Sequence, residues 1–468
     1  MRHVLAVLAL MVATTVHAQN SVLVWTFDNL PDGPLDAHPL ANGDVVYSDT
    51  NFVRDITPTF PSGGVVGNVL SGNLTGARRL TNGDTLTRFN NGTDEQVGRM
   101  DPSGTVNWFF GTGSGLCTDT TLNAPADAIQ LSGGDYLISD TDNRRIIRVD
   151  ASKNKVWQYG RADCGGGTGP NEFQKPKGVH EQSNGNILVV DSHRVVEIQP
   201  TLPTGGNIVR SYGSSLTPGS GPGQLRGPHF AEGLPNGNWL IADTSNHRVI
   251  ETAPDGSIVW QYGVTGVLGA GDGFLHDPTF VRGMPNGNVL IADYFNLRLL
   301  IVSPLTVALG PMPPLEVGVC SPPVDLRAQD TTGAIQTAPG STPVTFVANG
   351  GLEMFSDAGC TALVSTSTLG AGQVFLRANN EGTGTVTVSA PLFHPSTHAW
   401  SAAFTAPSGG GAGGTPPGTP PGDNGGGGPG VRLMRVGWAC NTAPFADGAT
   451  GCLVVVVLRL IGRRRMRR

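Results

Sequence analysis

The chain has 468 residues, enough for two or three domains, with 67 glycines, 35 prolines and only 14% charged residues. This composition is typical of many short strands joined by tight turns, and it gives no sign of long helices. The net charge is −6, but six arginines stand in the last ten residues, so the rest of the chain sums to −12. An acidic body argues against a nucleic-acid partner, whose phosphates need clustered Lys and Arg.

The first 18 residues have the pattern of a secretory signal peptide. A short basic start at Met1-Arg2-His3 is followed by an apolar run from Val4 to Val16, and Val16-His17-Ala18 offers a cleavage site after Ala18. A membrane anchor is the alternative, but the apolar run is too short to span a bilayer comfortably. We therefore expect an exported protein.

An exported chain can form disulfides, and this one has six cysteines. The simplest pairing joins cysteines of the same region: Cys117 with Cys164, Cys320 with Cys360, and Cys440 with Cys452. None of these pairs has the CxxC spacing of a zinc or redox site.

A turn motif recurs six times between residues 42 and 288, at spacings of 40 to 52 residues. The copies are Asn42-Gly43-Asp44, Asn82-Gly83-Asp84, Gly133-Gly134-Asp135, Asn184-Gly185-Asn186, Asn236-Gly237-Asn238 and Asn286-Gly287-Asn288. Asn-Gly favours a tight hairpin because both residues tolerate positive φ. Four strand-like runs surround each turn; in the fifth repeat we expect strands over Pro228 to Leu234, Trp239 to Ala242, Arg248 to Thr252 and Ser257 to Tyr262. Four short strands in about 45–50 residues make one propeller blade.

The last repeat lacks an outer strand such as Val259-Trp260-Gln261-Tyr262. The missing strand stands at the mature N-terminus, from Ser21 to Phe27. We predict that it pairs with the last blade and closes the ring, which leaves no ragged sheet edge. The predicted fold is thus an all-β, six-bladed β-propeller over residues 19–303, followed by a small β-sandwich.

Several repeats share a strand ending in Asp, a short turn with Asn, and an Arg that begins the next strand. The clearest copy runs from Leu240-Ile241-Ala242-Asp243 through Asn246 to Arg248, whereas the second repeat has Phe89 in place of the Asp. This signature resembles that of the NHL-repeat family, and the resemblance covers about 280 residues. It implies an NHL-like propeller. For the Asp, Asn and Arg side chains we favour a structural role, in which Asp caps the turn and Arg braces it.

Function in propellers is usually found at a mouth of the central channel, so the innermost strands were aligned on their turns. One position reads His38, Arg78, Ile129, His180, Glu232 and Arg282. We expect these six side chains at one level around the channel, with Asp36, Asp127 and His229 nearby. We refer to His38, Arg78, His180, Glu232 and Arg282 as the channel ring.

Three interpretations of the channel ring remain open. In the first, it binds a ligand: Arg78 and Arg282 grip a carboxylate, sulfate or phosphate, and His38 and His180 orient it. In the second, the protein is an enzyme. His38 and His180 hold a divalent metal, as resemblance to NHL-related lyases implies, or a histidine accepts a sulfuryl group, as resemblance to arylsulfotransferases implies. In the third, the ring is structural.

The sequence contains no GxSxG, HExxH or P-loop motif that decides for an enzyme. We therefore favour a displayed binding or interaction module for a protein, a glycan or a small anionic ligand, with the catalytic residues unknown. The channel-centred enzyme is the alternative.

Residues 304–406 alternate polar and apolar side chains in short strands, as in Gly384-Thr385-Val386-Thr387-Val388-Ser389. They resemble the bacterial immunoglobulin-like modules of surface proteins. Residues 407–430 are almost entirely Gly, Pro, Thr and Ser, which predicts a linker. Residues 431–468 combine a motif around Cys440, a short apolar run and the arginine cluster. They resemble myxobacterial C-terminal sorting signals, which implies attachment to the cell envelope through Cys440; a basic tail without such a role is the alternative.

Overall fold

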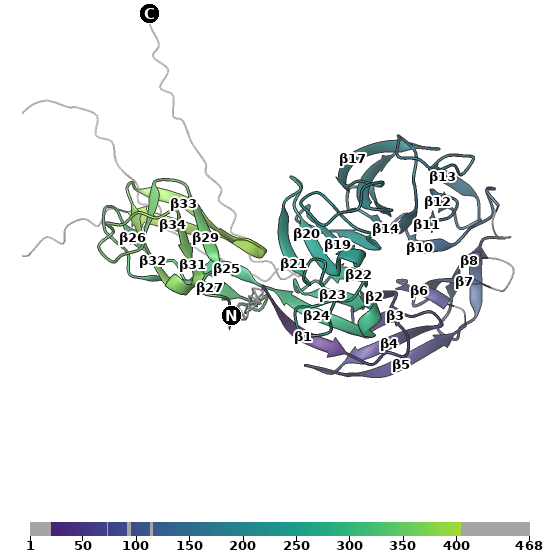
Figure 1. The fold of residues 1–468 in the computed structure, drawn as a ribbon, viewed down its shortest axis with the longest axis horizontal. Helices are drawn as coiled ribbons and strands as arrows, with labels where there is room; N and C mark the ends of the chain where they lie inside the picture. Colours follow the sequence, from purple (N-terminus) through teal and green to yellow (C-terminus); the bar gives the residue numbers. More distant parts are fainter. Residues whose placement is uncertain (1–19, 73, 91–94, 113–115, 404–468) are drawn as a thin grey trace, which may run out of the picture. The chain divides into compact units, whose positions relative to one another are not determined.

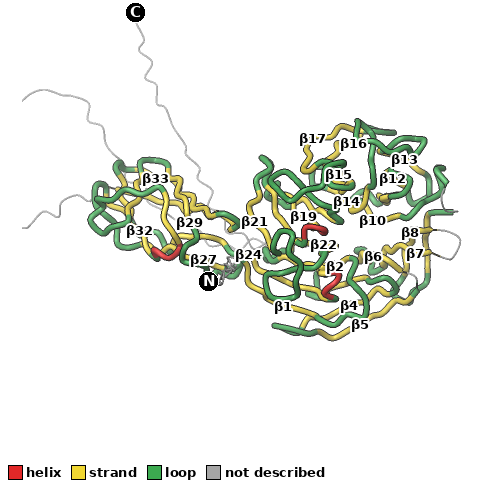
Figure 2. Tube along the Cα trace, viewed as in Figure 1, coloured by secondary structure: helices red, strands yellow, loops and turns green. Residues whose placement is uncertain are grey.

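The computed structural model describes residues 20–72, 74–90, 95–112 and 116–403. The regular structure in these residues is almost all β-strand, with short 3-10 turns at η1 (Thr244–Asn246), η2 (Tyr294–Asn296) and η3 (Leu369–Ala371) (Figure 2). The expected signal peptide, linker and C-terminal tail, including Cys440, lie outside the described residues. No helix in the described ranges is long and apolar enough to cross a membrane.

Six four-stranded sheets form the ring of a β-propeller (Figure 1). Blade one comprises β2 (Asp36–Pro39), β3 (Val45–Ser48), β4 (Phe52–Pro58) and β5 (Gly64–Ser71). Blade two comprises β6 (Leu74–Arg79), β7 (Thr85–Asn90), β8 (Glu95–Met100) and β9 (Val106–Phe110). Blade three comprises β10 (Pro125–Gln130), β11 (Tyr136–Asp140), β12 (Arg145–Val149) and β13 (Lys155–Tyr159).

The second half of the ring repeats this order. Blade four comprises β14 (Pro176–Glu181), β15 (Ile187–Asp191), β16 (Arg194–Pro200) and β17 (Gly206–Gly213). Blade five comprises β18 (Phe230–Gly233), β19 (Trp239–Asp243), β20 (Arg248–Thr252) and β21 (Ile258–Tyr262). Blade six comprises β22 (Pro278–Gly283), β23 (Val289–Asp293), β24 (Arg298–Pro304) and, from the N-terminus, β1 (Ser21–Phe27).

The N-terminal strand closes the ring, as the sequence predicts. β1 pairs antiparallel with β24, from Ser21 opposite Pro304 to Phe27 opposite Leu299. Trp25 is fully buried, and its Nε1 donates a hydrogen bond to the Gly63 carbonyl at 2.7 Å. β1 therefore covers the edge of β24, and its Trp25 side chain anchors the last blade to the first.

The core of the propeller lies between successive blades. The second strands β11, β15, β19 and β23 are buried at every position because neighbouring sheets cover both of their faces. One apolar cluster, for example, joins Leu137 and Trp157 of blade three to Val189 and Val196 of blade four. A single blade has no such cover, which is why the repeats are stable only as a ring.

In blades three to six, the Asp at the end of the second strand ties that strand to the start of its own blade. In blade five, one oxygen of Asp243 accepts from the Arg226 backbone N–H at 2.8 Å, and the other accepts from Asn246 and Arg248, both at 2.8 Å. His247, just before the arginine, has a left-handed backbone with φ of 55°. These contacts show the aspartate holding the turn and the incoming chain together.

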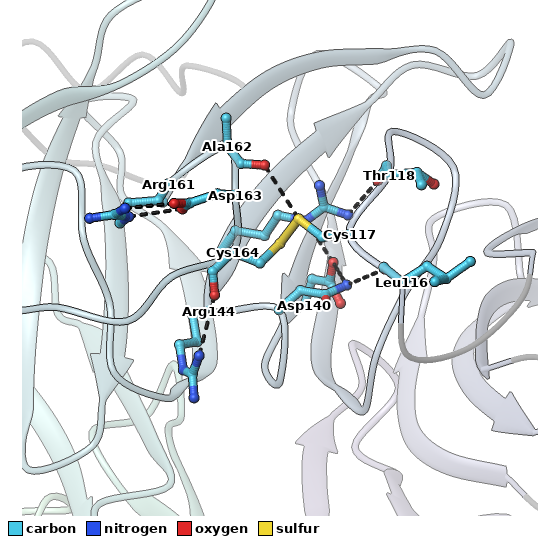
Figure 3. Close-up of a disulfide and its surroundings, with 12 residues drawn as sticks. Leu116, Cys117, Thr118, Asp140, Arg144, Arg161, Ala162, Asp163 and Cys164 are labelled. Atoms are coloured by element: carbon cyan, nitrogen blue, oxygen red, sulfur yellow. Dashed lines mark hydrogen bonds and ion pairs between the residues drawn. A yellow bond between two sulfur atoms is a disulfide. The ribbon is translucent and has the colours of Figure 1, made fainter.

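Both cysteine pairs predicted within the described residues are confirmed. Cys117 bonds to Cys164 and Cys320 bonds to Cys360. Figure 3 shows the first disulfide beside the blade-three turn that contains Asp140, where Arg144 donates to the Cys164 carbonyl at 3.3 Å. The bond therefore joins the loop that enters blade three to the loop that leaves it.

The remaining described residues form one curled ten-stranded sheet. Its strands are β25 (Thr306–Leu309), β26 (Leu315–Glu316), β27 (Val324–Gln329), β28 (Ile335–Gln336), β29 (Pro343–Ala348), β30 (Leu352–Phe355), β31 (Thr366–Thr368), β32 (Gln373–Ala378), β33 (Gly382–Ala390) and β34 (Phe393–Ala403). A core of its own contains Phe346, Leu376, Val388 and Trp400. The relationship to immunoglobulin-like modules stays a prediction.

Candidate functional site

The inner strand of every blade lines the central channel, and β6, β10, β14 and β22 surround its centre in Figure 1. The six aligned positions lie at one level because each pairs with the second residue of the next strand. The pairs are His38 with Val46, Arg78 with Leu86, Ile129 with Leu137, His180 with Leu188, Glu232 with Leu240 and Arg282 with Leu290.

A cavity of about 590 Å³ opens beside this level, at the end of the channel where the inner strands finish. Four members of the channel ring line it: His38, Arg78, His180 and Arg282. Glu232, the fifth member, accepts a hydrogen bond from the Gly283 backbone N–H at 2.7 Å and forms an ion pair with Arg282 at 3.3 Å. Glu232 therefore fixes Arg282 rather than lining the cavity.

The two arginines are each held by one carboxylate. Arg78 contacts both oxygens of Asp127 at 3.3 Å, and the other pair is Arg282 with Glu232. Each carboxylate also accepts a backbone N–H of the following blade, as Asp127 does from Val179 at 3.0 Å. Asp36 makes the same kind of contact with the Ala77 N–H at 2.9 Å. These acidic groups therefore join adjacent blades and orient the arginines.

The electrostatics of the cavity keep its histidines neutral. Burial, together with the charges of Arg282 and Arg78, lowers the pKa of His180 to about 3. Burial first, and then Arg78 and Arg282, hold the pKa of His38 well below its usual range. Burial also raises the pKa of Glu232. An imidazole without charge can donate one hydrogen bond and accept another.

Two buried side-chain nitrogens of the ring have no hydrogen-bond partner within the described ranges. They are Nε2 of His38 and Nη1 of Arg282. A buried guanidinium nitrogen without a partner costs free energy, so it marks a place where a ligand oxygen is favoured.

A divalent metal, the possibility raised for His38 and His180, does not fit these residues. The described part of the chain has no group of three or more His, Cys, Asp or Glu that could hold a metal ion. The two imidazoles also stand beside Arg78 and Arg282, whose charges act on both of them. Two neighbouring cations repel a divalent cation and attract an anion.

A second cavity of about 310 Å³ lies where the inner strands begin, and the channel ring does not include its residues. It is lined by Lys177, His229, Thr141, Phe230 and Phe280, among others. The sequence predicted His229 to lie near the channel ring, whereas Lys177 was not singled out. Its only signal in the sequence was its position one residue after Pro176, at the start of an inner strand, β14.

Comparisons with known proteins show likeness in fold only. No protein-family model matches the chain, and no curated protein matches its sequence. Among solved structures, a streptogramin B lyase is similar over 57% of this chain and 77% of that chain, at 16% identity and a TM-score of 0.39. A virginiamycin B lyase from Staphylococcus aureus is similar over 60% and 98%, at 12% identity and a TM-score of 0.42.

An auxiliary nutrient binding protein from Bacteroides thetaiotaomicron is similar over 58% of this chain and 68% of that chain, at 12% identity and a TM-score of 0.43. Lyases and a binding protein thus stand side by side among the similar structures. At these identities and TM-scores the likenesses carry no argument about activity.

Proposed function

We propose that this protein is an exported binding module whose propeller holds a small anionic ligand in the 590 Å³ channel cavity. The observation that carries the proposal is the pair of buried nitrogens without partners, His38 Nε2 and Arg282 Nη1. The volume lies within the usual range for small-molecule sites, about 300–1,000 Å³.

Binding follows from how the arginines are held. Glu232 and Asp127 orient Arg282 and Arg78 while leaving guanidinium nitrogens for a ligand, and a planar guanidinium suits carboxylate, sulfate or phosphate oxygens. The neutral imidazoles of His38 and His180 add hydrogen-bond donors without the cost of burying further charge. The carboxylates are already engaged, so they oppose the ligand less than free ones would.

Export and surface display complete the proposal. The N-terminal 18 residues, the Gly- and Pro-rich linker and the tail with Cys440 are the features that support it. Two disulfides are typical of proteins that fold in an oxidising compartment. In this arrangement the curled sheet is an immunoglobulin-like spacer, and the propeller meets its ligand outside the cell.

Isothermal titration of the purified chain with inorganic sulfate, phosphate and 4-nitrophenyl sulfate tests the proposal. We expect Arg282→Gln to lower the affinity for the bound anion by about tenfold or more, since a charge-assisted hydrogen bond contributes about 1.5–3 kcal/mol. Arg148→Gln is the matched control because Arg148 pairs with Asp135 at 2.6 Å and does not line the cavity.

Arg282→Gln leaves Glu232 without its cation, so Arg78→Gln and His180→Gln are measured beside it. If all three variants keep their far-ultraviolet circular dichroism and bind every tested anion within about twofold of the wild type, the proposal is wrong.

Sulfuryl transfer is a second candidate, favoured by one observation. His180 is a neutral imidazole beside two arginines, which suits a nucleophile whose developing anion needs stabilisation. Release of 4-nitrophenol from 4-nitrophenyl sulfate, abolished in His38→Gln or His180→Gln but retained in Arg148→Gln, is the expected result for this function. Binding of the aryl sulfate without its turnover supports the binding module instead.

A further inference from the structure

The second cavity stands apart from the anion site. All inner strands begin at its end of the channel, and the channel ring lies toward the opposite end. Arg78 lines the first cavity, Asp127 lines the second, and their side chains contact each other at 3.3 Å between the two. An inference about the second cavity therefore does not depend on the proposed function.

A β-bulge places Lys177 in this cavity. On β14, Pro176 pairs with Asp191 and the next paired residue is Val179 with Val189, so one extra residue leaves the ladder. The Gly178 N–H donates instead to the His229 carbonyl of the next blade at 3.1 Å. A Cβ at Gly178 would lie 2.8 Å from that carbonyl oxygen, which explains the glycine. Lys177 and His229 thus line the cavity from adjacent blades.

The chain has only four lysines, and three of them have a partner. Lys153 lies over the Phe109 ring at 4.0 Å, Lys155 pairs with Asp119, and Lys175 pairs with Asp142 at 3.7 Å. Lys177 makes no hydrogen bond or ion pair with any of the described residues, although it is partly buried. A lysine amine in that position is poorly solvated and has nothing to stabilise its charge.

The surrounding charges act in the same direction. Burial first, and then the charge of Lys175, lower the pKa of Lys177 to about 8. Burial, Lys177 and Arg88 lower the pKa of His229 to about 3. The carboxylates of the cavity wall, Asp36 and Asp127, are already occupied by backbone N–H groups of neighbouring blades.

The rest of the wall suits an apolar molecule with one polar end. The Phe230 and Phe280 rings lie with their centroids 4.0 Å apart. The Thr141 hydroxyl is buried and has no partner within the described ranges. Two other cations line the wall: Lys175 is paired with Asp142 at 3.7 Å, and Arg88 is engaged with the carbonyls of Thr75 and Pro125 at 2.9 and 3.2 Å. The Lys177 amine and the Thr141 hydroxyl therefore have no partner among the described residues, whereas Arg88 and Lys175 do.

We propose that Lys177 is a carbonyl-binding residue that forms an imine with an aldehyde of apolar body at the end of the channel opposite the anion site. The neutral amine attacks the carbonyl carbon, a C–N bond forms, and the oxygen takes up a proton that the nitrogen releases. Loss of that oxygen as water, with the second amine proton, leaves the C=N bond. Thr141 donates to the carbonyl oxygen, and the neutral His229 relays the protons.

Reductive trapping of the full-length protein tests this inference. The protein is incubated with benzaldehyde and cyanoborohydride at about pH 7, and peptide mass spectrometry quantifies the secondary amine at each of the four lysines. At that pH the neutral fraction of Lys177 exceeds that of an ordinary lysine by about two hundredfold, and its lower basicity makes each neutral amine less reactive. We expect Lys177 to be alkylated about tenfold faster than Lys153, an exposed lysine that does not line the cavity.

Further variants separate the cavity from mere exposure. Thr141→Val is expected to slow labelling at Lys177 several-fold and to leave Lys153, which lies outside the cavity, unchanged, so Lys153 serves as an internal reference in every digest. Saturating sulfate should leave labelling at Lys177 unchanged, which distinguishes this site from the anion site. Labelling of Lys177 no faster than that of Lys153, Lys155 and Lys175 overturns the inference, whatever the anion titrations show.

Discussion

Replacing Arg248 with methionine should destabilise the propeller far more than its single ion pair would suggest on a surface. The side chains of Asp243 and Arg248 are 0% and 3% exposed, and Nε of Arg248 lies 2.8 Å from Asp243. The variant leaves the Asp243 carboxylate buried without its cation. Removal of one partner from a buried pair costs about 3–5 kcal/mol. Burial already raises the pKa of Asp243, so its protonation relieves part of that cost.

The matched control is Arg148→Met. Arg148 and Asp135 lie 2.6 Å apart, but their side chains are 34% and 22% exposed, so solvent screens the pair and the expected loss is below about 1 kcal/mol. Urea unfolding of the full chain, followed by tryptophan fluorescence, measures both variants, since Trp239 and Trp260 are buried in the same blade as Asp243. Equal losses of free energy of unfolding in the two variants would refute the argument that burial makes the difference.

Three other predictions concern the site, the disulfide and the ring. The pKa of His180 is about 3 in the folded chain and about 6.5 in the unfolded chain, so the unfolded state binds more protons between these values and stability falls as pH decreases through that window. At about pH 4.5 protonation of this group in the unfolded chain costs about 2.5 kcal/mol of stability relative to about pH 7. Urea titrations should therefore show a smaller loss of stability in acid for His180→Gln, and identical pH profiles contradict the assignment. The disulfide between Cys117 and Cys164 spans 47 residues, so replacing both by serine should lower the free energy of unfolding by up to about 4 kcal/mol, and an unchanged urea midpoint argues against that role. Deleting residues 20–27 should expose the β24 edge and cause aggregation measurable by light scattering, and a stable monomer would show that closure is dispensable.

The repeat architecture could be predicted from the sequence because its signals are local. Each Asn-Gly or Gly-Gly turn predicts one hairpin, and the alternation of polar and apolar side chains predicts each strand. The number of turns therefore gave the number of blades. Blade five shows how close the prediction came. The strand expected from Arg248 to Thr252 has those bounds in the structure, whereas the inner strand expected from Pro228 begins at Phe230. The end of a strand depends on cross-strand pairing, which a single strand does not encode.

The candidate site was predictable only in part, for the same reason. His38, Arg78, His180, Glu232 and Arg282 could be placed at one level because all five lie at the same distance in sequence from their turns. In a hairpin, that distance fixes which residue of the next strand each one pairs with. This distance could not show that Glu232 holds Arg282 and leaves the other four around the cavity, since that pair joins side chains of two blades.

Lys177 marks what only the tertiary structure decided. By itself the sequence determined that β14 is an inner strand of the fourth repeat, and nothing in its alternation distinguishes Lys177 from Lys175. The bulge after Pro176 and the approach of Gly178 to the His229 carbonyl bring Lys177 into a partly buried cavity without a partner. The bulge depends on the pairing of β14 with β15, and the Gly178 contact joins blade four to blade five. The desolvation of an amine depends on such packing and not on its neighbours in the chain.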